Sequence, residues 1–260
     1  MNFETIHLEK KNDVLWVWLN RENKVSTINL KMMKELIGLA DWLREESEIK
    51  FVVFTNKGKL FSAGFDLYNF NEEIENKDEA PQFIRSMSII GQELMRKLEN
   101  LEQISIAALR GSAYGGGVAI AMTTDFRLMA DGTVFNLPET NVGLFLNWGC
   151  TPRLVKAVGA LKAKEIIMLC EDITSDECSH LGLVNKVVST EKLDNEVDQL
   201  IEKIRGKGYY SIRMTKKLVN ASIMANVGDV FINEPELAER VITSGETKEK
   251  VDKFMKRAQK

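Results

Sequence analysis

The fold of this chain is decided by the stretch Gly-Ser-Ala-Tyr-Gly-Gly-Gly-Val-Ala-Ile-Ala-Met at residues 111–122. It directly follows an apolar run at residues 104–109, which has the length of a buried strand, and it leads into an apolar helical pattern. The three successive glycines, Gly115 to Gly117, leave backbone N–H groups at a helix start that no side chain covers, and the helix dipole adds partial positive charge there. The stretch predicts a strand–turn–helix unit whose turn can bind an oxyanion or a phosphate.

The glycine triplet can also be explained without a ligand, because close packing of a helix against a strand favours glycine too. Two phosphate-binding motifs are excluded, since neither the Gly-Lys-Ser/Thr ending of a P-loop nor a G-x-G-x-x-G spacing is present. From this stretch alone, anion binding and close packing both stay open.

Strand and helix patterns alternate on either side of this stretch. Asn29 can cap a helix with apolar residues three and four apart up to Leu43, and a second amphipathic helix runs from Phe83 to Leu101. This alternation predicts an α/β layer architecture. Short apolar runs predict strands at residues 14–19, 51–55, 104–109, 126–129 and 183–188.

A further short helix is predicted to begin at Thr174, where Glu177 completes a capping box, and to end near Gly182. Beyond the last predicted strand, helical patterns follow one another to the C-terminus. We therefore expect two regions, an α/β core at residues 1–195 and a helical region at residues 196–260.

Two other segments depart from ordinary core or surface patterns. Residues 61–67, Phe-Ser-Ala-Gly-Phe-Asp-Leu, place small residues between large apolar ones, which suggests backbone that approaches something closely or simply a tight turn. Residues 137–149 contain Glu139 as a lone carboxylate among apolar neighbours. Burial there would raise its pKa toward neutrality and suit it to acid/base catalysis, although a lone glutamate can equally be solvated or salt-bridged.

The composition is that of an ordinary globular protein, with 44% hydrophobic and 28% charged residues. A formal net charge of −3 argues against a nucleic-acid partner, which would require a concentrated basic surface. The one basic concentration lies between Lys248 and Lys260 and is interleaved with acidic residues. It indicates a solvated helix face or a contact with a phosphorylated small molecule.

Metal, membrane and secretory features are not expected. The three cysteines form no C-x-x-C pair, and the only histidines are His7 and His180, too few and too scattered for a zinc site. An odd number of cysteines fits a reducing compartment. The N-terminal residues do not form a secretory signal, and the longest apolar stretch, residues 104–122, carries an arginine and four glycines. We expect a cytoplasmic protein that does not enter a membrane.

Taken together, the three unusual segments resemble in order and spacing the crotonase superfamily, also called the enoyl-CoA hydratase/isomerase family. The resemblance covers nearly the whole chain, and its specificity comes from the combination of motifs. It is carried by residues 19–21, 26–29, 61–67, 111–125, 138–143, 149–154 and 182–188 and by the helical C-terminus.

The resemblance implies a crotonase-like spiral of ββα units followed by a C-terminal helical trimerisation region, in homotrimers or homohexamers. It implies that the backbone N–H groups of Phe65 and Gly116 bind the thioester oxygen and that Glu139 is the acid/base. The substrate would be an acyl-CoA or an acyl-carrier thioester, and no further cofactor is expected.

The resemblance also assigns binding residues. For CoA it implies Lys24, Thr27, Ala63, Asp66 and Leu67. For the acyl pocket we expect Tyr114, Ala119, Asn147 and Trp148.

One departure from the family pattern affects the predicted reaction. Hydratases of the family commonly use two glutamates, and the first of these positions is occupied here by Ala119, which cannot move a proton. One carboxylate suffices when a single base removes a proton from one carbon and returns it to another, so Δ3–Δ2 enoyl-CoA isomerisation is favoured. A hydratase, dehydratase or lyase acting on a specialised acyl thioester, with Asn147 or a bound water replacing the missing glutamate, is the alternative. A non-catalytic structural paralogue is the third hypothesis.

Overall fold

A computed structural model of the chain describes residues 3–19, 26–67 and 80–224, together with residues 235, 239, 242, 251–253 and 255–256. Lys24 and most of the predicted helical region beyond residue 224 lie outside the described residues. Within the described residues, no helix is long and apolar enough to span a membrane.

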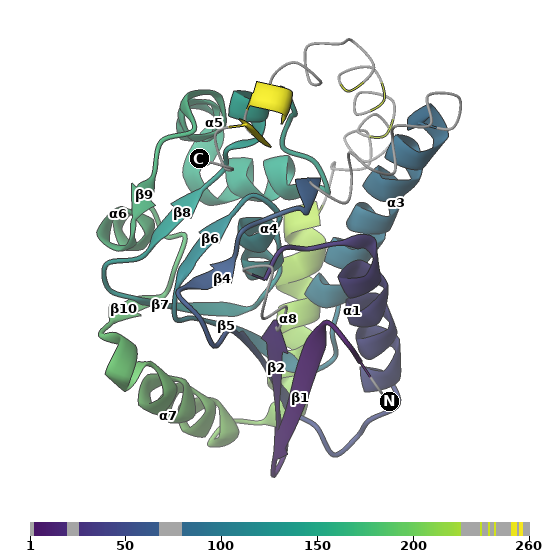
Figure 1. The fold of residues 1–260 in the computed structure, drawn as a ribbon. Coiled ribbons are helices and arrows are strands. Elements are labelled where there is room, and N and C mark those ends of the chain that lie inside the picture. The colour runs from purple at the N-terminus through teal and green to yellow at the C-terminus, as the bar shows by residue number, and fades with distance from the viewer. Residues whose placement is uncertain are drawn as a thin grey trace.

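A six-stranded sheet forms the centre of the molecule (Figure 1). Its first two strands are antiparallel, and every later neighbour is added in parallel. In spatial order the strands are β1 (Ile6–Lys11), β2 (Val14–Leu19), β3 (Phe51–Thr55), β5 (Ile104–Leu109), β7 (Phe126–Ala130) and β10 (Lys186–Val188).

A second sheet has four short strands, β4 (Leu60–Ser62), β6 (Ser112–Tyr114), β8 (Val134–Asn136) and β9 (Ile173–Thr174), in that order. Three successive pairs of strands, β3–β4, β5–β6 and β7–β8, each place their first strand in the large sheet and their second in the small one. A helical segment follows each pair. This repetition is the spiral of ββα units that the family resemblance implied.

Helices cover both faces of the large sheet. They are α1 (Leu30–Leu43), α3 (Ala80–Glu99), α4 (Gly116–Met122), α5 (Cys150–Leu169), α6 (Ser175–His180), α7 (Leu193–Arg205) and α8 (Tyr209–Met224), with 3-10 turns η1 (Glu139–Val142) and η2 (Thr190–Lys192). β3 is buried on both sides, because Val52 and Phe54 join the core under α1 and α3 while Phe51 and Val53 pack against α7.

Several local predictions are confirmed. Asn29 caps α1 by accepting a hydrogen bond from the Met32 N–H at 2.9 Å. Thr174 and Glu177 form the reciprocal capping box of α6. Four of the five predicted strands coincide with β2, β3, β5 and β7, the last being one residue longer than expected.

The prediction of a strand at residues 183–188 is wrong in its first half. The N–H groups of Leu183 and Val184 donate to the Cys178 carbonyl at 2.8 and 3.3 Å, so these residues close the turn after α6. The strand β10 begins only at Lys186. Among the described residues no strand follows β10, as predicted, but the division of the chain into two regions at residue 195 stays a prediction.

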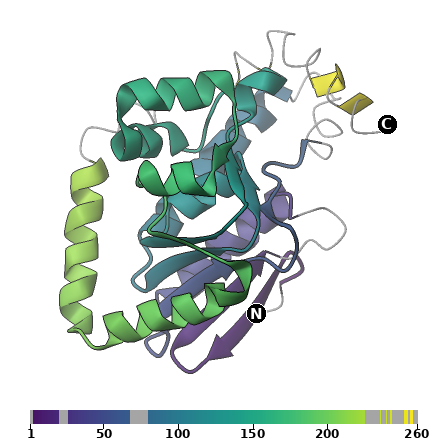
Figure 2. The same ribbon diagram turned by 90° about the vertical axis from the view of Figure 1, so that its left-hand side faces the viewer.

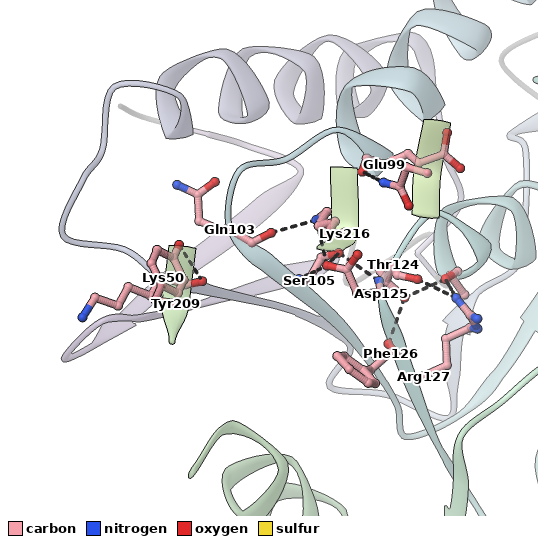
Figure 3. A network of polar contacts seen from close by, with 12 residues as sticks. Lys50, Glu99, Gln103, Ser105, Thr124, Asp125, Phe126, Arg127, Tyr209 and Lys216 are labelled. Atoms are coloured by element: carbon pink, nitrogen blue, oxygen red, sulfur yellow. Dashed lines mark hydrogen bonds and ion pairs between the residues drawn. The ribbon is translucent and has the colours of Figure 1, made fainter. Parts of the chain in front are cut away.

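A polar network ties α8 to the residues at the start of β5 and β7 (Figure 3). The Lys216 ammonium donates to the Gln103 carbonyl at 2.8 Å and to Asp125 Oδ2 at 2.7 Å. The same carboxylate oxygen accepts from the N–H and hydroxyl of Ser105 at 2.8 and 3.0 Å. Figure 2 shows α8 running along one side of the molecule, and this network is one of the contacts that hold the helix there.

Candidate active site

The glycine turn joins β6 to α4 and has the conformation that the sequence predicted. Gly115 precedes the helix with φ +46°, a value that side chains rarely adopt, and its N–H donates to the Asn136 carbonyl at 2.9 Å. Gly116 is the first residue of α4, so its N–H has no acceptor within the helix. Each of the three glycines also lies against a different neighbour, with no room for a Cβ. A Cβ on Gly115 would lie 2.7 Å from Glu139 Oε1. On Gly116 it would lie 2.6 Å from the Trp148 ring, and on Gly117 2.7 Å from the Ser62 side chain. Close packing is therefore one reason for the triplet, and anion binding by the N–H of Gly116 stays a prediction.

The segment around Phe65 is held beside Ile28. The Ile28 N–H donates to the Gly64 carbonyl at 2.8 Å, and the Asp66 N–H donates to the Ile28 carbonyl at 3.0 Å. In an extended segment, successive N–H groups point to opposite sides. Because Asp66 points its N–H toward Ile28, the N–H of Phe65 points away from it.

The two glycine-containing segments meet at Gly64. A Cβ built on Gly64 would lie 3.0 Å from the Tyr114 carbonyl oxygen and 3.7 Å from the Gly116 nitrogen. The backbone just before Phe65 therefore touches the backbone just before Gly116. This contact places the two predicted oxyanion donors in one small region of the fold.

Glu139 begins the turn η1, which follows β8, and its side chain reaches back to the glycine turn. Its Oε2 atom is inaccessible to solvent and has no hydrogen-bond partner among the described residues. Burial disfavours the charged carboxylate and raises the pKa of Glu139 from 4.5 to about 7, against a smaller lowering effect of the residue's own backbone N–H. A carboxyl group with this pKa can both accept and donate a proton near neutral pH.

A cavity of about 90 Å³, the space of several water molecules, connects these groups. The residues predicted for catalysis and for the acyl pocket mostly line it. They are Phe65, Gly116, Ala119, Glu139, Asn147 and Trp148.

The described lining of the cavity does not include Tyr114, which lies in β6. The predicted CoA residues that the structure describes, Thr27, Ala63, Asp66 and Leu67, also lie outside this lining. Asp66 is buried and accepts a hydrogen bond from the Thr27 hydroxyl at 3.2 Å, so this pair joins two of the predicted segments. The CoA-binding roles of Thr27, Ala63, Asp66 and Leu67 stay predictions.

Helix α3 also contributes to the site, and this contribution was not predicted. Ile84, Met87 and Ser88 line the cavity from this helix, and the Ser88 hydroxyl donates to Asn147 Oδ1 at 3.0 Å. A signal was present, because Ser88 follows Ile84 by four residues and falls on the apolar face of the helix, where a polar residue requires a partner.

Trp148 forms one wall of the cavity. It has φ +57°, an uncommon value for a residue with a side chain, and is only 8% exposed. Its indole packs edge-on against the Phe65 ring, with 5.7 Å between ring centroids. A Cβ at Gly91 would lie 2.0 Å from the indole, so glycines on α3 and α4 make the space for this ring.

The arrangement suits proton transfer at a carbon beside a carbonyl group. Two backbone N–H groups can stabilise the oxyanion that forms when the proton leaves, and the carboxyl group of Glu139 can take the proton. In the described part of the chain, no three His, Cys, Asp or Glu side chains are grouped as metal ligands.

Comparisons with known proteins identify the family of this chain. A model of the enoyl-CoA hydratase/isomerase family matches residues 9–260. The chain is 30% identical to a short-chain-enoyl-CoA hydratase of Clostridium acetobutylicum, over 99% of this chain and 97% of that protein. It is 29% identical to a crotonyl-CoA hydratase of Syntrophomonas wolfei, with the same coverage of both. The solved structure of an enoyl-CoA hydratase from Mycobacterium avium subsp. paratuberculosis has the same fold, with a TM-score of 0.87 and 21% identity, over 98% of this chain and 97% of that one.

Fold and site thus define a protein of the crotonase superfamily. The chain belongs to the enoyl-CoA hydratase/isomerase family, whose members act on acyl-CoA thioesters, and it is an enzyme of that family.

Proposed function

We propose that this enzyme isomerises 3-enoyl-CoA to 2-enoyl-CoA with Glu139 as its only acid/base. The observation that carries the proposal is the environment of this carboxyl group. Its Oε2 atom is buried without a partner among the described residues, and the first position of the family's glutamate pair is occupied by Ala119, in the wall of the same cavity.

In this reaction Glu139 removes a proton from the carbon next to the thioester carbonyl and returns it farther along the acyl chain. The N–H groups of Phe65 and Gly116 stabilise the enolate oxygen in between. Losing one such donor typically raises the barrier by about 3–4 kcal/mol. A pKa of about 7 suits Glu139 to both proton transfers, because the base form takes the proton and the acid form gives it back.

Hydration of a 2-enoyl-CoA is the second candidate. The relatives from Clostridium acetobutylicum and Syntrophomonas wolfei are both named hydratases. Without a carboxylate at position 119, the attacking water would need another partner, and the amide of Asn147 lines the same cavity.

A panel of 2-enoyl- and 3-enoyl-CoA thioesters separates these reactions. We expect fast isomerisation of the 3-enoyl-CoA, slow hydration of crotonyl-CoA, and no activity of Glu139→Gln on either. Efficient hydration of crotonyl-CoA would reverse the order of the two candidates. Retention of most activity in Glu139→Gln would remove Glu139 from the mechanism.

The variant Ala119→Glu is a matched test of the missing carboxylate. It should raise the hydration rate relative to isomerisation if the second glutamate is what the wild-type protein lacks. CoA-dependent thermal stabilisation without turnover of any thioester would instead support a non-catalytic paralogue.

The substrate carrier and the assembly are further parts of the proposal. We propose a CoA thioester as substrate, with no additional cofactor, bound through Thr27, Ala63, Asp66 and Leu67. Enzyme assays with acyl-CoA and with the same acyl group on a carrier protein would distinguish the two donors.

We also propose a homotrimer or homohexamer, because large apolar side chains on α5 and α8 are exposed, including Leu161 at 85%, Tyr210 at 77% and Leu218 at 71%. Sedimentation of the purified protein measures its mass. A monomer at micromolar concentration would contradict this assembly. Three buried cysteines without disulfides fit a reducing compartment, and we propose the cytoplasm.

A further inference from the structure

The side-chain amide of Asn147 has an orientation that its neighbours determine. The backbone N–H of Trp148 lies 2.6 Å from one end of the amide, and the Ser88 hydroxyl lies 3.0 Å from the same end. A backbone N–H can only donate a hydrogen bond, so the atom facing it must be the oxygen Oδ1. The other end of the amide is therefore the NH2 group.

Turning the amide over would be unfavourable. It would place the NH2 group against the Trp148 N–H and remove the acceptor of both bonds. The supports are rigid, since Ser88 is 2% exposed within α3 and the Trp148 ring lies in the space left by Gly91 and Gly116. The NH2 group is thus a preorganised hydrogen-bond donor.

This donor belongs to the cavity that contains Glu139. Asn147 is half-buried and lines the cavity, and no described residue accepts a hydrogen bond from its NH2 group. The other polar side chains of the described lining are Glu139 and Ser88, and the Ser88 hydroxyl already donates to Asn147. The rest of that lining is aliphatic and phenyl side chains, the Trp148 indole with its single N–H donor, and one glycine. A plain hydrocarbon chain that filled the cavity would displace water from the Asn147 NH2 group and would offer no hydrogen-bond acceptor in its place.

We propose that Asn147 is a specificity-determining residue that selects acyl thioesters with an acceptor oxygen, as a hydroxyl or keto group, on the acyl chain beyond the reacting carbons. This inference rests on the proposed function, because it assumes that the acyl group of a CoA thioester occupies the cavity. Ser88 acts as a positioning residue that orients the amide.

Binding of unreactive saturated acyl-CoA thioesters tests the proposal without turnover. The probes are a short plain acyl-CoA and acyl-CoAs of the same length with a hydroxyl or a keto group toward the end of the chain. Wild-type protein should bind the oxygen-bearing thioesters about 3- to 10-fold more tightly, the range that one hydrogen bond supplies. Asn147→Leu keeps the size of the side chain but lacks the donor, and it should abolish this preference.

Asn147→Asp provides a second, independent test of the NH2 donor. Its carboxylate still accepts from Trp148 and Ser88, but it offers an acceptor to the cavity. It should therefore bind the keto thioester more weakly than the hydroxyl thioester, because only a hydroxyl can donate. Ser88→Ala is the matched control, since it leaves the NH2 group in place and should retain part of the preference.

The outcomes separate the role of Asn147 from the proposed function. If wild type binds plain and oxygen-bearing thioesters equally, or if Asn147→Leu weakens both equally, the inference is overturned while acyl-CoA binding and the proposed function stand. If Asn147→Leu lowers the rate of hydration of crotonyl-CoA and leaves thioester preference unchanged, the amide holds a water and the inference is again overturned. If no acyl-CoA binds, both proposals fail.

Discussion

The substitution Glu139→Gln tests how strongly the cavity disfavours a charged carboxylate. The pKa of Glu139 rises from 4.5 to about 7 because of burial. One pKa unit corresponds to about 1.4 kcal/mol, so the ionised side chain destabilises the folded state by about 3 kcal/mol relative to the unfolded chain. Glutamine has nearly the same shape and carries no charge, so it removes this term.

The sign of the effect depends on pH. Between pH 4.5 and about 7 the folded protein holds the Glu139 proton while the unfolded chain has lost it, so the stability of wild type falls as pH rises through this window. The free energy of unfolding of Glu139→Gln, minus that of wild type, should therefore increase by about 3 kcal/mol from about pH 4 to about pH 8. Below this window both side chains are neutral and the difference is constant.

Chemical denaturation of both proteins at a fixed protein concentration measures this difference. Thermal stability at the same pH values provides a check, because Glu139→Gln should gain stability over wild type only on the alkaline side. The same difference at all pH values would refute the reasoning, since it would mean that Glu139 titrates alike in the folded and unfolded states.

Three further perturbations follow from the same geometry. The kcat/KM of wild type should rise with pH through an apparent pKa of about 7, because the base form of Glu139 starts the reaction; a profile flat from pH 5 to pH 9 would contradict this. Gly115→Ala should lower both activity and stability, because the φ of Gly115 is +46° and the new Cβ would lie 2.7 Å from Glu139 Oε1. Gly132→Ala is the matched control: Gly132 also has a positive φ but open space around it, so this variant should lower stability alone. Lys216→Met should cost about 1.5–3 kcal/mol of unfolding free energy in chemical denaturation, because it leaves the part-buried Asp125 carboxylate beside α8 without its cation. A loss under about 1 kcal/mol would show that Ser105 satisfies Asp125 on its own.

The central strands were predictable from sequence because each is buried on both faces. Residues 14–19, 51–55 and 104–109 are unbroken apolar runs, and they became β2, β3 and β5 without change. The strands of the small sheet were not predicted. β4, β6, β8 and β9 have two or three residues each, too few to show a period, and residues such as Ser112 and Asn136 resemble a loop.

Residues 183–184 show why an apolar run can mislead. Leu183 and Val184 are as buried as strand residues, but their N–H groups close the turn after α6. Burial determines which positions are apolar, but backbone hydrogen bonding determines whether those residues form a strand or a turn.

In the candidate site, too, some features were visible in the local sequence and others were not. Local signals identified Glu139 and the glycine turn, because an isolated carboxylate and uncovered backbone are visible along the chain. The contacts of Trp148 with Gly91 and of Asn147 with Ser88 join residues 57 and 59 positions apart, and no local pattern specifies such pairings. Sequence could thus name the candidate carboxyl group and, through the family resemblance, part of the cavity lining, but not the contacts of α3 that position Asn147 and Trp148.

The residues around Glu139 explain why one carboxyl group can suffice for the proposed isomerisation. In a pair of carboxylates, repulsion raises one pKa and leaves the other low, so acid and base are different groups. Here burial among Trp148, Leu144 and the glycine turn raises the pKa of Glu139 to about 7 without a second charge. A group with that pKa is populated in both protonation states near neutral pH, which is what a reaction that borrows and returns one proton requires. With Ala119 in the wall, this environment favours the proposed proton transfer within one acyl chain, whereas the addition of water would rely on Glu139 together with another polar group of the lining, such as Asn147.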